Sequence, residues 1–394
     1  MSLKMSEASK TEVLMIMRGR YARRGRQARS RLLDELCALC SYERKYAIKL
    51  LGGKRRVEGK ARGRSGSKPT YGEAERTVLK VIWLAAEQPC GKRLKAAVPL
   101  WLPDYEREHG ALEGGLRGRV LKMSAATMDQ LLAPCRVSLG SRGRCGTRPG
   151  TLLRKQIPIR TEHWDVAGPG WLEADTVAHC GESMAGDFVW TVTLTDVHTQ
   201  WTETRAVWNK GQHSVAARIA EVEKALPFPI LGFDSDNGGE FINWHLADYF
   251  SLRKEAVAFT RSRAYHKNDN ARVEQKNWSH VRQLIGYGRL GDPAQAEALN
   301  TLYTRRWNLF RNFYCPAMKH LRTEVEGSSK KRIYDAPTTP FERLKACAGV
   351  DPTQIARLEK LMAAHPPFEL KRRIEKALRR VLKPPAPSRL ACAA

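Results

Sequence analysis

Three carboxylates from separated segments of the chain have the types and spacing of a site for metal-assisted chemistry. Asp175 lies in the run Trp-Leu-Glu-Ala-Asp-Thr-Val, Asp236 follows 61 residues later, and Glu274 follows after another 38. Carboxylate oxygens suit hard cations such as Mg²⁺, which keep several waters and need few protein ligands. Two such cations activate the attacking oxygen and stabilise the leaving oxygen of an in-line phosphoryl transfer. In a chain of formal charge +27, the phosphate that these acids suit is that of DNA.

The elements that must position the first two acids have the pattern of β-strands. Residues 188–194 and 202–207 are rich in β-branched and aromatic residues, which predicts two strands with Asp196 in the turn between them. Residues 229–234 form a short apolar run that ends in an Asp/Gly-rich cluster, as in a buried strand that opens into a loop. Asp236 is therefore expected at or just past a strand end.

Glu274 belongs to a different kind of element. Apolar residues recur with helical spacing from about Asn270 to Leu284, which predicts a helix with Val273 and Val281 on its buried side and Asn270 as its N-cap. Such a helix would bring one carboxylate to the two that the sheet presents.

Two motifs carry a resemblance to a known family. They are Ser-Asp-Asn-Gly-Gly-Glu-Phe at 235–241 and Lys-Asn-Asp-Asn-Ala-Arg-Val-Glu-Gln-Lys-Asn at 267–277. With them, the stretch from Trp164 to Asp292 resembles the retroviral-integrase-type core of bacterial insertion-sequence transposases, the DDE family with an RNase-H-like fold. The spacing between the second and third acids is slightly longer than is typical of the family, which lengthens a loop.

The resemblance implies an α/β core with a mixed five-stranded sheet flanked by helices. It also implies two bound Mg²⁺ or Mn²⁺ ions. The catalytic residues that it implies are also the metal ligands, namely Asp175, Asp236 and Glu274.

Other acids nearby leave alternatives open. Glu173 would share a strand face with Asp175 and competes with it. Asp234 competes with Asp236 by the same argument, although Asp236 is preferred because Asn237 and Gly238 follow it. Glu240 is expected to open the next helix rather than to line the site. Asp196 and Asp269 have the setting of turn residues, and two histidines are expected to be structural because metal-bound water already supplies the nucleophile: His179 and His280.

Charge divides the chain into blocks. Residues 1–160 hold 35 Lys/Arg and 14 Asp/Glu, residues 161–300 hold 13 and 19, and residues 301–394 hold 20 and 8. An acidic block that holds metal ligands, between two basic blocks, suits an enzyme that processes DNA, because basic segments release counterions from phosphates.

Five parts are expected along the chain. They are a basic arm with a first helix-turn-helix (1–68), a second helical DNA-binding unit (69–136), a basic linker (137–160), the catalytic core (161–300) and a basic, partly helical C-terminal region with a disordered tail (301–394).

The first unit is expected to bind DNA through its second helix. A helix over 31–39 is followed by a break at Ser41, the expected N-cap of a helix over 42–51 that stops at Gly52. This pattern indicates a helix-turn-helix with all-α structure. The residues expected to contact DNA from its polar side are Arg44, Lys45 and Lys49.

Further DNA contacts are expected beyond the first unit. In the second unit, Ser124 has the setting of an N-cap for a helix whose Thr127 and Gln130 would face DNA. The loop before the helix of Glu274 is polar and basic. The residues of this loop and helix expected to contact DNA phosphates are Arg261, Arg263, Lys267, Arg272 and Lys276.

The remaining composition places the chain in a reducing compartment. Nine cysteines show no disulfide framework, and Cys37 and Cys40 are expected to pack in a helix core. The sequence contains no run of about 18 apolar residues, so it does not predict a membrane span. The chain is therefore expected in the bacterial cytoplasm, associated with the nucleoid.

The sequence thus predicts a transposase. It would bind the terminal inverted repeats of its own element, cut the 3′ ends and join them to target DNA, as a homodimer or larger assembly on double-stranded DNA. The alternatives are a structure-selective nuclease of the RNase H superfamily and a sequence-specific DNA-binding regulator without catalysis.

Overall fold

The computed structural model divides into two compact units, Met1–Pro69 and Thr70–Ala394. It describes residues 5–52, 70–136, 166–236, 238–241, 243–261, 271–326 and 329–383. The expected linker, 137–160, and the last eleven residues lie outside this part of the chain.

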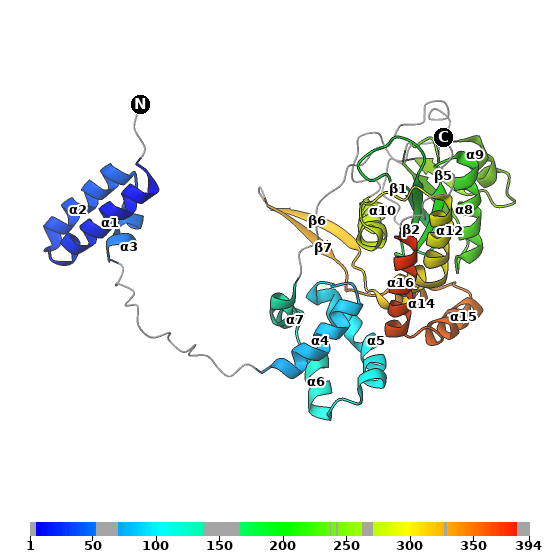
Figure 1. Cartoon of the computed structure of the whole chain (residues 1–394), viewed down its shortest axis with the longest axis horizontal. Helices are drawn as coiled ribbons and strands as arrows, with labels where there is room; N and C mark the ends of the chain where they lie inside the picture. Colours follow the sequence, from blue (N-terminus) through cyan, green and yellow to red (C-terminus); the bar gives the residue numbers. More distant parts are fainter. Residues whose placement is uncertain are drawn as a thin grey trace, which may run out of the picture. The chain divides into compact units, whose positions relative to one another are not determined.

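The first unit contains three helices around a small core of its own (Figure 1). They are α1 (Glu7–Ala22), α2 (Arg26–Cys40) and α3 (Arg44–Gly52). Met17, Leu36 and Ala47 are buried, one from each helix, so the three helices need one another to cover their apolar sides. Cys37 and Cys40 pack on this core, as the sequence predicted.

Two details of the first unit differ from the sequence prediction. Helix α1 was not foreseen, because its apolar residues lie between many basic ones. Ser41 ends α2 in the left-handed conformation, with φ 57°, and does not cap the following helix, which begins three residues later at Arg44.

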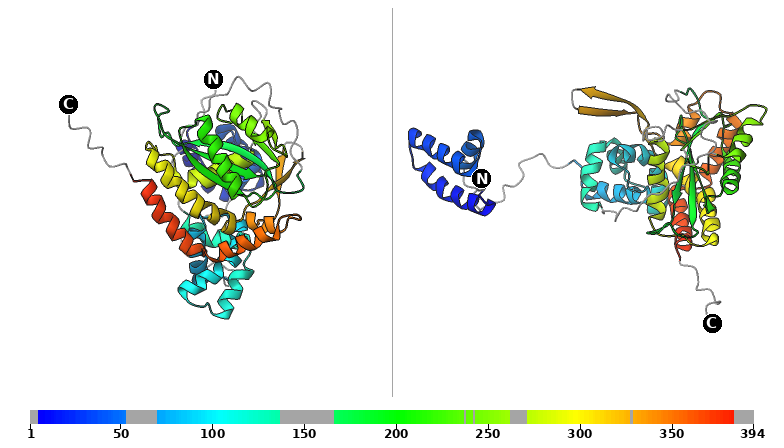
Figure 2. Two further views of the ribbon diagram at one scale, coloured as in Figure 1. Left: turned by 90° about the vertical axis from the view of Figure 1, so that its right-hand side faces the viewer. Right: turned by 90° about the horizontal axis from the view of Figure 1, so that it is seen from above.

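The second unit is built around a mixed five-stranded sheet flanked by helices, as the resemblance to an integrase-type core implied (Figures 1 and 2). The strand order is β3-β2-β1-β4-β5; β1, β2 and β3 pair antiparallel, and β4 pairs parallel with both β1 and β5. The strands are β1 (Trp171–Ala178), β2 (Val189–Asp196), β3 (Thr202–Trp208), β4 (Gly232–Ser235) and β5 (Ala258–Arg261).

Helices connect and flank these strands. Helix α8 joins β3 to β4, α9 joins β4 to β5, and one long helical stretch with a π-helical turn follows β5. Their bounds are α8 (Gln212–Ala225), α9 (Trp244–Ser251), α10 (Ala271–Lys276), the π-helical turn η3 (Asn277–Arg282) and α11 (Gln283–Ile285). The predicted helix over 270–284 is thus confirmed from residue 271, with Val273 and Val281 fully buried.

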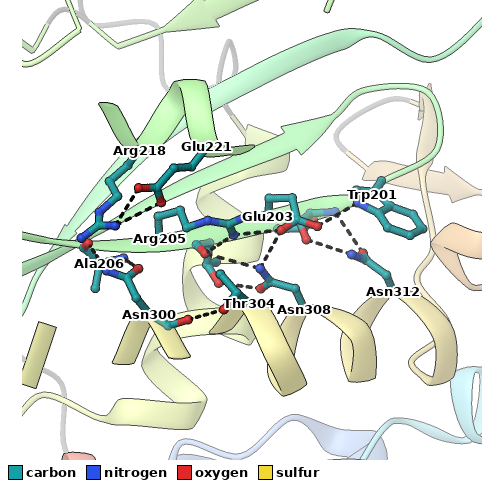
Figure 3. A network of polar contacts seen from close by, with 12 residues as sticks. Trp201, Glu203, Arg205, Ala206, Arg218, Glu221, Asn300, Thr304, Asn308 and Asn312 are labelled. Carbon is teal, nitrogen blue, oxygen red and sulfur yellow. Dashed lines mark hydrogen bonds and ion pairs between the residues drawn. The ribbon is translucent and has the colours of Figure 1, made fainter. Parts of the chain in front are cut away.

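A second helical stretch runs along β3, the edge strand of the sheet (Figure 3). It consists of α12 (Pro293–Leu302), the π-helical turn η4 (Tyr303–Trp307) and α13 (Asn308–Tyr314). The amide of Asn300 pairs with the backbone N–H and C=O of Ala206, at 2.7 and 2.8 Å, and that of Asn312 pairs with Thr202, at 3.0 Å for both bonds. Side-chain amides therefore take the place of a neighbouring strand.

The helices of residues 70–136 share the core of the sheet. They are α4 (Glu73–Ala85), α5 (Gly91–His109), α6 (Gly114–Lys122) and α7 (Ala125–Leu132). Trp101 of α5 is fully buried, donates from Nε1 to the carbonyl of Tyr314 at 3.1 Å, and packs on Phe310. The parts that the sequence divides at 136 and 300 belong to one compact unit, Thr70–Ala394.

The chain after α13 adds a hairpin and three helices. They are β6 (His320–Glu326), β7 (Ser329–Tyr334), α14 (Pro340–Lys345), α15 (Pro352–Ala363) and α16 (Pro367–Val381). The hairpin projects from the body of the unit in both views (Figures 1 and 2). Helix α15 ends at Ala363, and α16 begins at Pro367, directly after Pro366. Among the described helices, none has the length and apolar character that crossing a membrane requires.

Candidate functional site

Asp175 lies in the middle of β1, opposite Thr193 of β2. Its Oδ1 accepts the N–H of Thr176 at 2.7 Å, and its Oδ2 accepts the side-chain amide of Asn277 at 2.6 Å. Asn277 stands three residues after Glu274 on the following helix, so this bond ties the helix to the strand.

Asp236 directly follows β4, as the sequence predicted. Its Oδ1 accepts the N–H of Gly238 at 2.9 Å, which closes a tight turn. A Cβ at Gly238 would lie 2.6 Å from the carboxylate of Glu240 and 2.9 Å from that of Asp236. A larger residue at Gly238 would therefore force at least one of these two carboxylates to move.

The acids repel one another, and their pKa values report this. Burial, followed by repulsion from Asp236, raises the pKa of Asp175 to about 8, and Glu274 and Glu240 add to the repulsion. Burial and Glu240 raise the pKa of Asp236 to about 6. Like charges that share a site raise pKa values in this way, so the acids of the cluster outweigh the positive charge beside them.

Glu240 lines the site, and the expectation that it opens the next helix is corrected: Asn243 caps α9 through its side chain. Glu240 is buried and accepts from Thr176 Oγ1 at 3.0 Å and from Lys210 Nζ at 3.2 Å. Lys210 also lies over the ring of Trp190. Sequence reasoning did not single out Lys210, since it stands just after a strand with no motif around it.

The start of the helix that carries Glu274 is anchored by Glu173. This carboxylate is fully buried, accepts from Arg272 Nη1 at 2.9 Å and faces the N–H of Val273 at 3.4 Å. Glu173 is thereby engaged by the start of this helix. Asp234, the alternative to Asp236, is likewise buried and accepts from Thr260 Oγ1 at 2.6 Å.

Glu274 itself is exposed on α10, close enough for its charge to raise the pKa of Asp175. Within the part of the chain that the structure describes, no group of three His, Cys, Asp or Glu side chains is close enough to hold a metal ion. The carboxylate donors and their excess negative charge fit a divalent cation at Asp175 and Asp236, whereas Glu274 does not complete a three-ligand set with them here.

Two histidines near the site are buried. His179 Nε2 bonds the hydroxyl of Thr191 at 2.8 Å, and burial lowers the pKa of His179 to about 3. Burial, with the charges of Arg311 and Lys276, holds the pKa of His280 well below its usual value. Both are neutral groups of the core, in line with the structural role predicted for them.

Asp196 is more than a turn residue. It is fully buried at the end of β2, where its two oxygens accept from the backbone of Gly170 at 2.8 Å and from the backbone and hydroxyl of Thr199 at 2.7 Å. These bonds fix the start of β1, the strand that carries Asp175.

The residues predicted to contact DNA phosphates near Glu274 are placed differently from one another. The predicted phosphate contact of Lys276 is wrong, because its side chain is only 4% exposed. Burial, followed by the charges of Arg311, Arg343 and Arg93, lowers the pKa of Lys276 to about 7. Arg272 pairs with Glu173, as described above. Arg261 is half-buried at the end of β5. Three further residues with sequence predictions lie outside the part of the chain that the structure describes: Arg263, Lys267 and Asp269.

In the helical parts, the predicted contacts are mostly exposed. Lys45 and Lys49 of α3 are exposed, whereas Arg44, also exposed, pairs with Asp34 of α2. Ser124 caps α7, as predicted, by accepting the N–H of Thr127 at 3.1 Å. Gln130 of the same helix is exposed.

Comparisons with known proteins give one clear relative. No protein-family model matches the chain. A protein of Sinorhizobium fredii, described as "Uncharacterized protein y4rM", is 38% identical over 348 residues, which span 87% of this chain and 97% of the relative. Among solved structures, the catalytic core domain of BIV integrase matches 30% of this chain and 70% of its own length, at 12% identity and a TM-score of 0.24. Such a low TM-score does not establish a shared fold, whereas the strand order β3-β2-β1-β4-β5 describes the core directly.

Proposed function

We propose that this chain, which belongs to the family of the Sinorhizobium fredii protein y4rM, is a transposase with a DDE-type catalytic core. It would bind the terminal inverted repeats of its own element, cut the phosphodiester at each 3′ end, and use the freed 3′-OH to attack target DNA. The observation that carries the proposal is the meeting of two mutually repelling acids, Asp175 from β1 and Asp236 from the end of β4.

The surrounding residues hold these acids in place. The amide of Asn277 orients Asp175, and the backbone N–H of Gly238 orients Asp236. Lys210 offsets the charge of Glu240, the third acid beside them. Pre-positioned groups of this kind lower the cost of bringing a charged phosphodiester into reacting geometry.

The residues that would hold metal are Asp175 and Asp236, with Glu274 as the third ligand of the proposal. When bound, two Mg²⁺ or Mn²⁺ ions would activate the attacking oxygen and stabilise the leaving one. Carboxylates without thiol ligands favour these oxygen-preferring ions. Glu173 and Arg272 fix the start of the helix from which Glu274 would act.

DNA binding would come mainly from the basic segments. The chain carries a formal charge of +27, and Lys45 and Lys49 present their charges on the exposed side of α3. Salt-dependent phosphate contacts from such segments supply affinity that does not depend on the acids. Because transposition must hold two ends together, the proposal includes a dimer or larger assembly.

The test is to incubate the full chain with Mg²⁺ and labelled DNA that carries the sequences flanking its gene. Joined products that need Asp175 and Asp236 would support a transposase. Nicks without joining would instead indicate a nuclease of the RNase H superfamily. Specific binding without cleavage, in Mg²⁺ and in Mn²⁺ alike, would indicate a regulator and overturn the proposal.

A further inference from the structure

A small polar cavity of about 50 Å³ lies behind the helix that carries Glu274. Its walls come from the turn after α4, from α5, from α11 and from the end of α13. The charged residues that line it are Arg93, Arg311 and Glu87. The volume is several times the roughly 10–15 Å³ that one water needs, so the cavity has room for a small polyatomic ion.

Arg311 places a buried guanidinium group at this cavity. Its side chain is 8% exposed, its Nε faces His280 Nε2 at 3.5 Å, and its guanidinium lies 5.5 Å from the centre of the Trp307 ring. Among the described residues, no carboxylate lies within ion-pair distance of it. A buried guanidinium without a counter-charge is costly, because burial removes its water without replacing it.

Further cationic groups gather beside Arg311. Lys276, 4% exposed, lies within range of the charges of Arg311, Arg343 and Arg93. The Nε atoms of Arg93 and Arg343 are buried and have no hydrogen-bond partner in the described structure.

The acids near the cavity are already paired with other cations. Glu87, which lines it, forms an ion pair with Lys371 of α16, and Asp335 forms one with Arg343. These pairs leave Arg93, Arg311 and Lys276 without a carboxylate partner in the part of the chain that the structure describes. The cavity therefore has an excess of positive charge and donors.

We propose that this cavity binds a phosphate group, supplied either as free inorganic phosphate or by the DNA backbone. The planar forks of the two arginines that line the cavity, Arg93 and Arg311, match the oxygens of a tetrahedral oxyanion. A cavity of about 50 Å³ admits a phosphate group but not a nucleoside attached to it within the cavity.

The position of the site gives the bound phosphate a consequence. Lys276 stands two residues after Glu274 and is buried where Glu274 is exposed, so the two occupy opposite sides of the helix. An anion held jointly by Arg311 and Arg93 would tie α13 to α5, beside Gln283 of the same helical stretch. The proposal does not depend on transposase activity, because binding can be measured without any reaction.

The test is a titration of the full, metal-free chain with inorganic phosphate at constant ionic strength, with chloride as the comparison. Binding to the native state alone raises the midpoint of thermal unfolding as phosphate exceeds its dissociation constant. We expect a saturable rise of at least about 2 °C for wild type. Arg311→Gln and Arg93→Gln should lose it, whereas Arg305→Gln, an exposed arginine four residues after Thr301 on the same helical stretch, should keep it.

If Arg311→Gln does not fold, as judged by circular dichroism, Arg93→Gln decides alone because its side chain is less buried. Equal rises in wild type and Arg93→Gln, or equal rises with phosphate and chloride, would overturn the proposal. A DNA duplex separates the two sources. Competition between phosphate and duplex in wild type but not in Arg93→Gln assigns the site to the DNA backbone, and simultaneous binding assigns it to free phosphate.

Discussion

Asp175 makes the metal-free protein sensitive to pH. Its pKa is about 8 in the folded chain, because of burial and its acidic neighbours, against about 3.9 in an unfolded chain. The folded state therefore binds a proton that the unfolded state has already lost between these values. Stability from this group is complete at low pH and is lost as pH rises towards 8.

Asp175→Asn should therefore stabilise the metal-free chain, and more at pH 8 than at pH 5. A gain of at least about 1 kcal/mol at pH 8 is expected, because one pKa unit corresponds to about 1.4 kcal/mol. Urea unfolding at both pH values measures it. Asp248→Asn, at an exposed acid of α9, serves as control and should change little at either pH. A gain that does not grow with pH would contradict the raised pKa.

The three proposed ligands should be needed for chemistry and not for DNA affinity. Asp175→Ala, Asp236→Ala and Glu274→Ala should each reduce cleavage and joining at least about 100-fold. Each change removes a proposed ligand of the metal ions that would stabilise the charge of the transition state. Binding to element ends should stay within about threefold, because affinity comes from the basic segments. Gel shifts and strand-transfer assays measure the two effects. Cleavage that survives Asp236→Ala but not Asp234→Ala would show that the wrong member of that pair was chosen.

At the scale of residues, sequence motifs predicted the position of some side chains, whereas the burial of others became known only from the fold. Asp236 could be predicted because Asn237 and Gly238 follow it, and the structure explains that glycine by its closeness to Glu240. The burial of Lys276 could not be predicted, because a helical pattern in sequence does not show that Arg311 and Arg343 come close to that side. Lys210 follows β3 and reaches Glu240 after β4 only in the folded chain, where β2 and β1 lie between these strands.

The ion pair of Glu173 with Arg272 should decide whether α10 starts in the right place. Glu173 is fully buried and Arg272 is 25% exposed, so Arg272→Gln leaves a buried carboxylate with a weaker partner. We expect a loss of about 1–3 kcal/mol in unfolding free energy, with a larger fractional loss of joining than of DNA binding.

The matched control is Arg218→Gln, because Arg218 pairs with Glu221 at the surface, where such pairs contribute about 0–1 kcal/mol. Adding Glu173→Gln to Arg272→Gln should restore most of the lost stability, since it removes the buried charge. No recovery in the double variant would mean that the pair does not act as an anchor.

The side-chain amides along β3 should contribute measurably to stability. Asn312 is fully buried and pairs with both backbone groups of Thr202 at 3.0 Å. Asn312→Leu keeps the branched arrangement of side-chain heavy atoms but leaves a buried N–H and C=O unpaired, which should cost about 2–4 kcal/mol in urea unfolding. Thr301→Ala, at an exposed position of α12, should cost less than about 0.5 kcal/mol. Equal effects of the two changes would show that Asn312 does not support the edge.

Most elements of the core could be predicted from periodicity. The strands at 189–196 and 202–208 and the helix from 271 have strong patterns, and the structure has them within two residues of the predicted bounds. The role of Asn300, Asn308 and Asn312 could not be predicted. Asparagines in a helix usually indicate an exposed side, and only the nearness of β3 makes them buried and paired.

At the scale of the whole molecule, the boundary between independent parts should fall near residue 69. A fragment of residues 1–69 should be helical and unfold cooperatively by circular dichroism, because Met17, Leu36 and Ala47 form a core of its own. This fragment should bind DNA, and its binding constant should fall steeply as salt rises. The logarithm of the constant should decrease by about 0.9 per unit of log salt for each phosphate contacted.

A fragment of residues 1–150 should instead aggregate or expose apolar surface. It contains Trp101 but lacks Phe310, Tyr314 and Phe368, whose rings contact Trp101 in the whole chain. Dye binding to exposed apolar surface, compared between fragments 1–69, 1–150 and 70–394, measures this. A soluble, cooperative 1–150 fragment would show that α4–α7 are an independent domain after all.

Charge blocks located the acidic core but not this boundary. The net charge changes sign near residue 160, whereas the compact units divide after Pro69. Charge reports the surface of a protein, and a domain is defined by its core. The contacts of Trp101 with residues more than two hundred positions later in the chain carry no signal in composition.

The two edges of the sheet should differ in how readily their backbone amides exchange hydrogen with water. On β3, the amides of Thr202 and Ala206 are closed by asparagines and should exchange only when the whole unit unfolds. On the opposite edge, β5 has four residues, none of them buried, and should open first. Because β5 pairs with β4, local opening would loosen the strand that Asp236 follows, while the β3 edge stays closed. Substrate access and global stability would then be governed by opposite edges of one sheet.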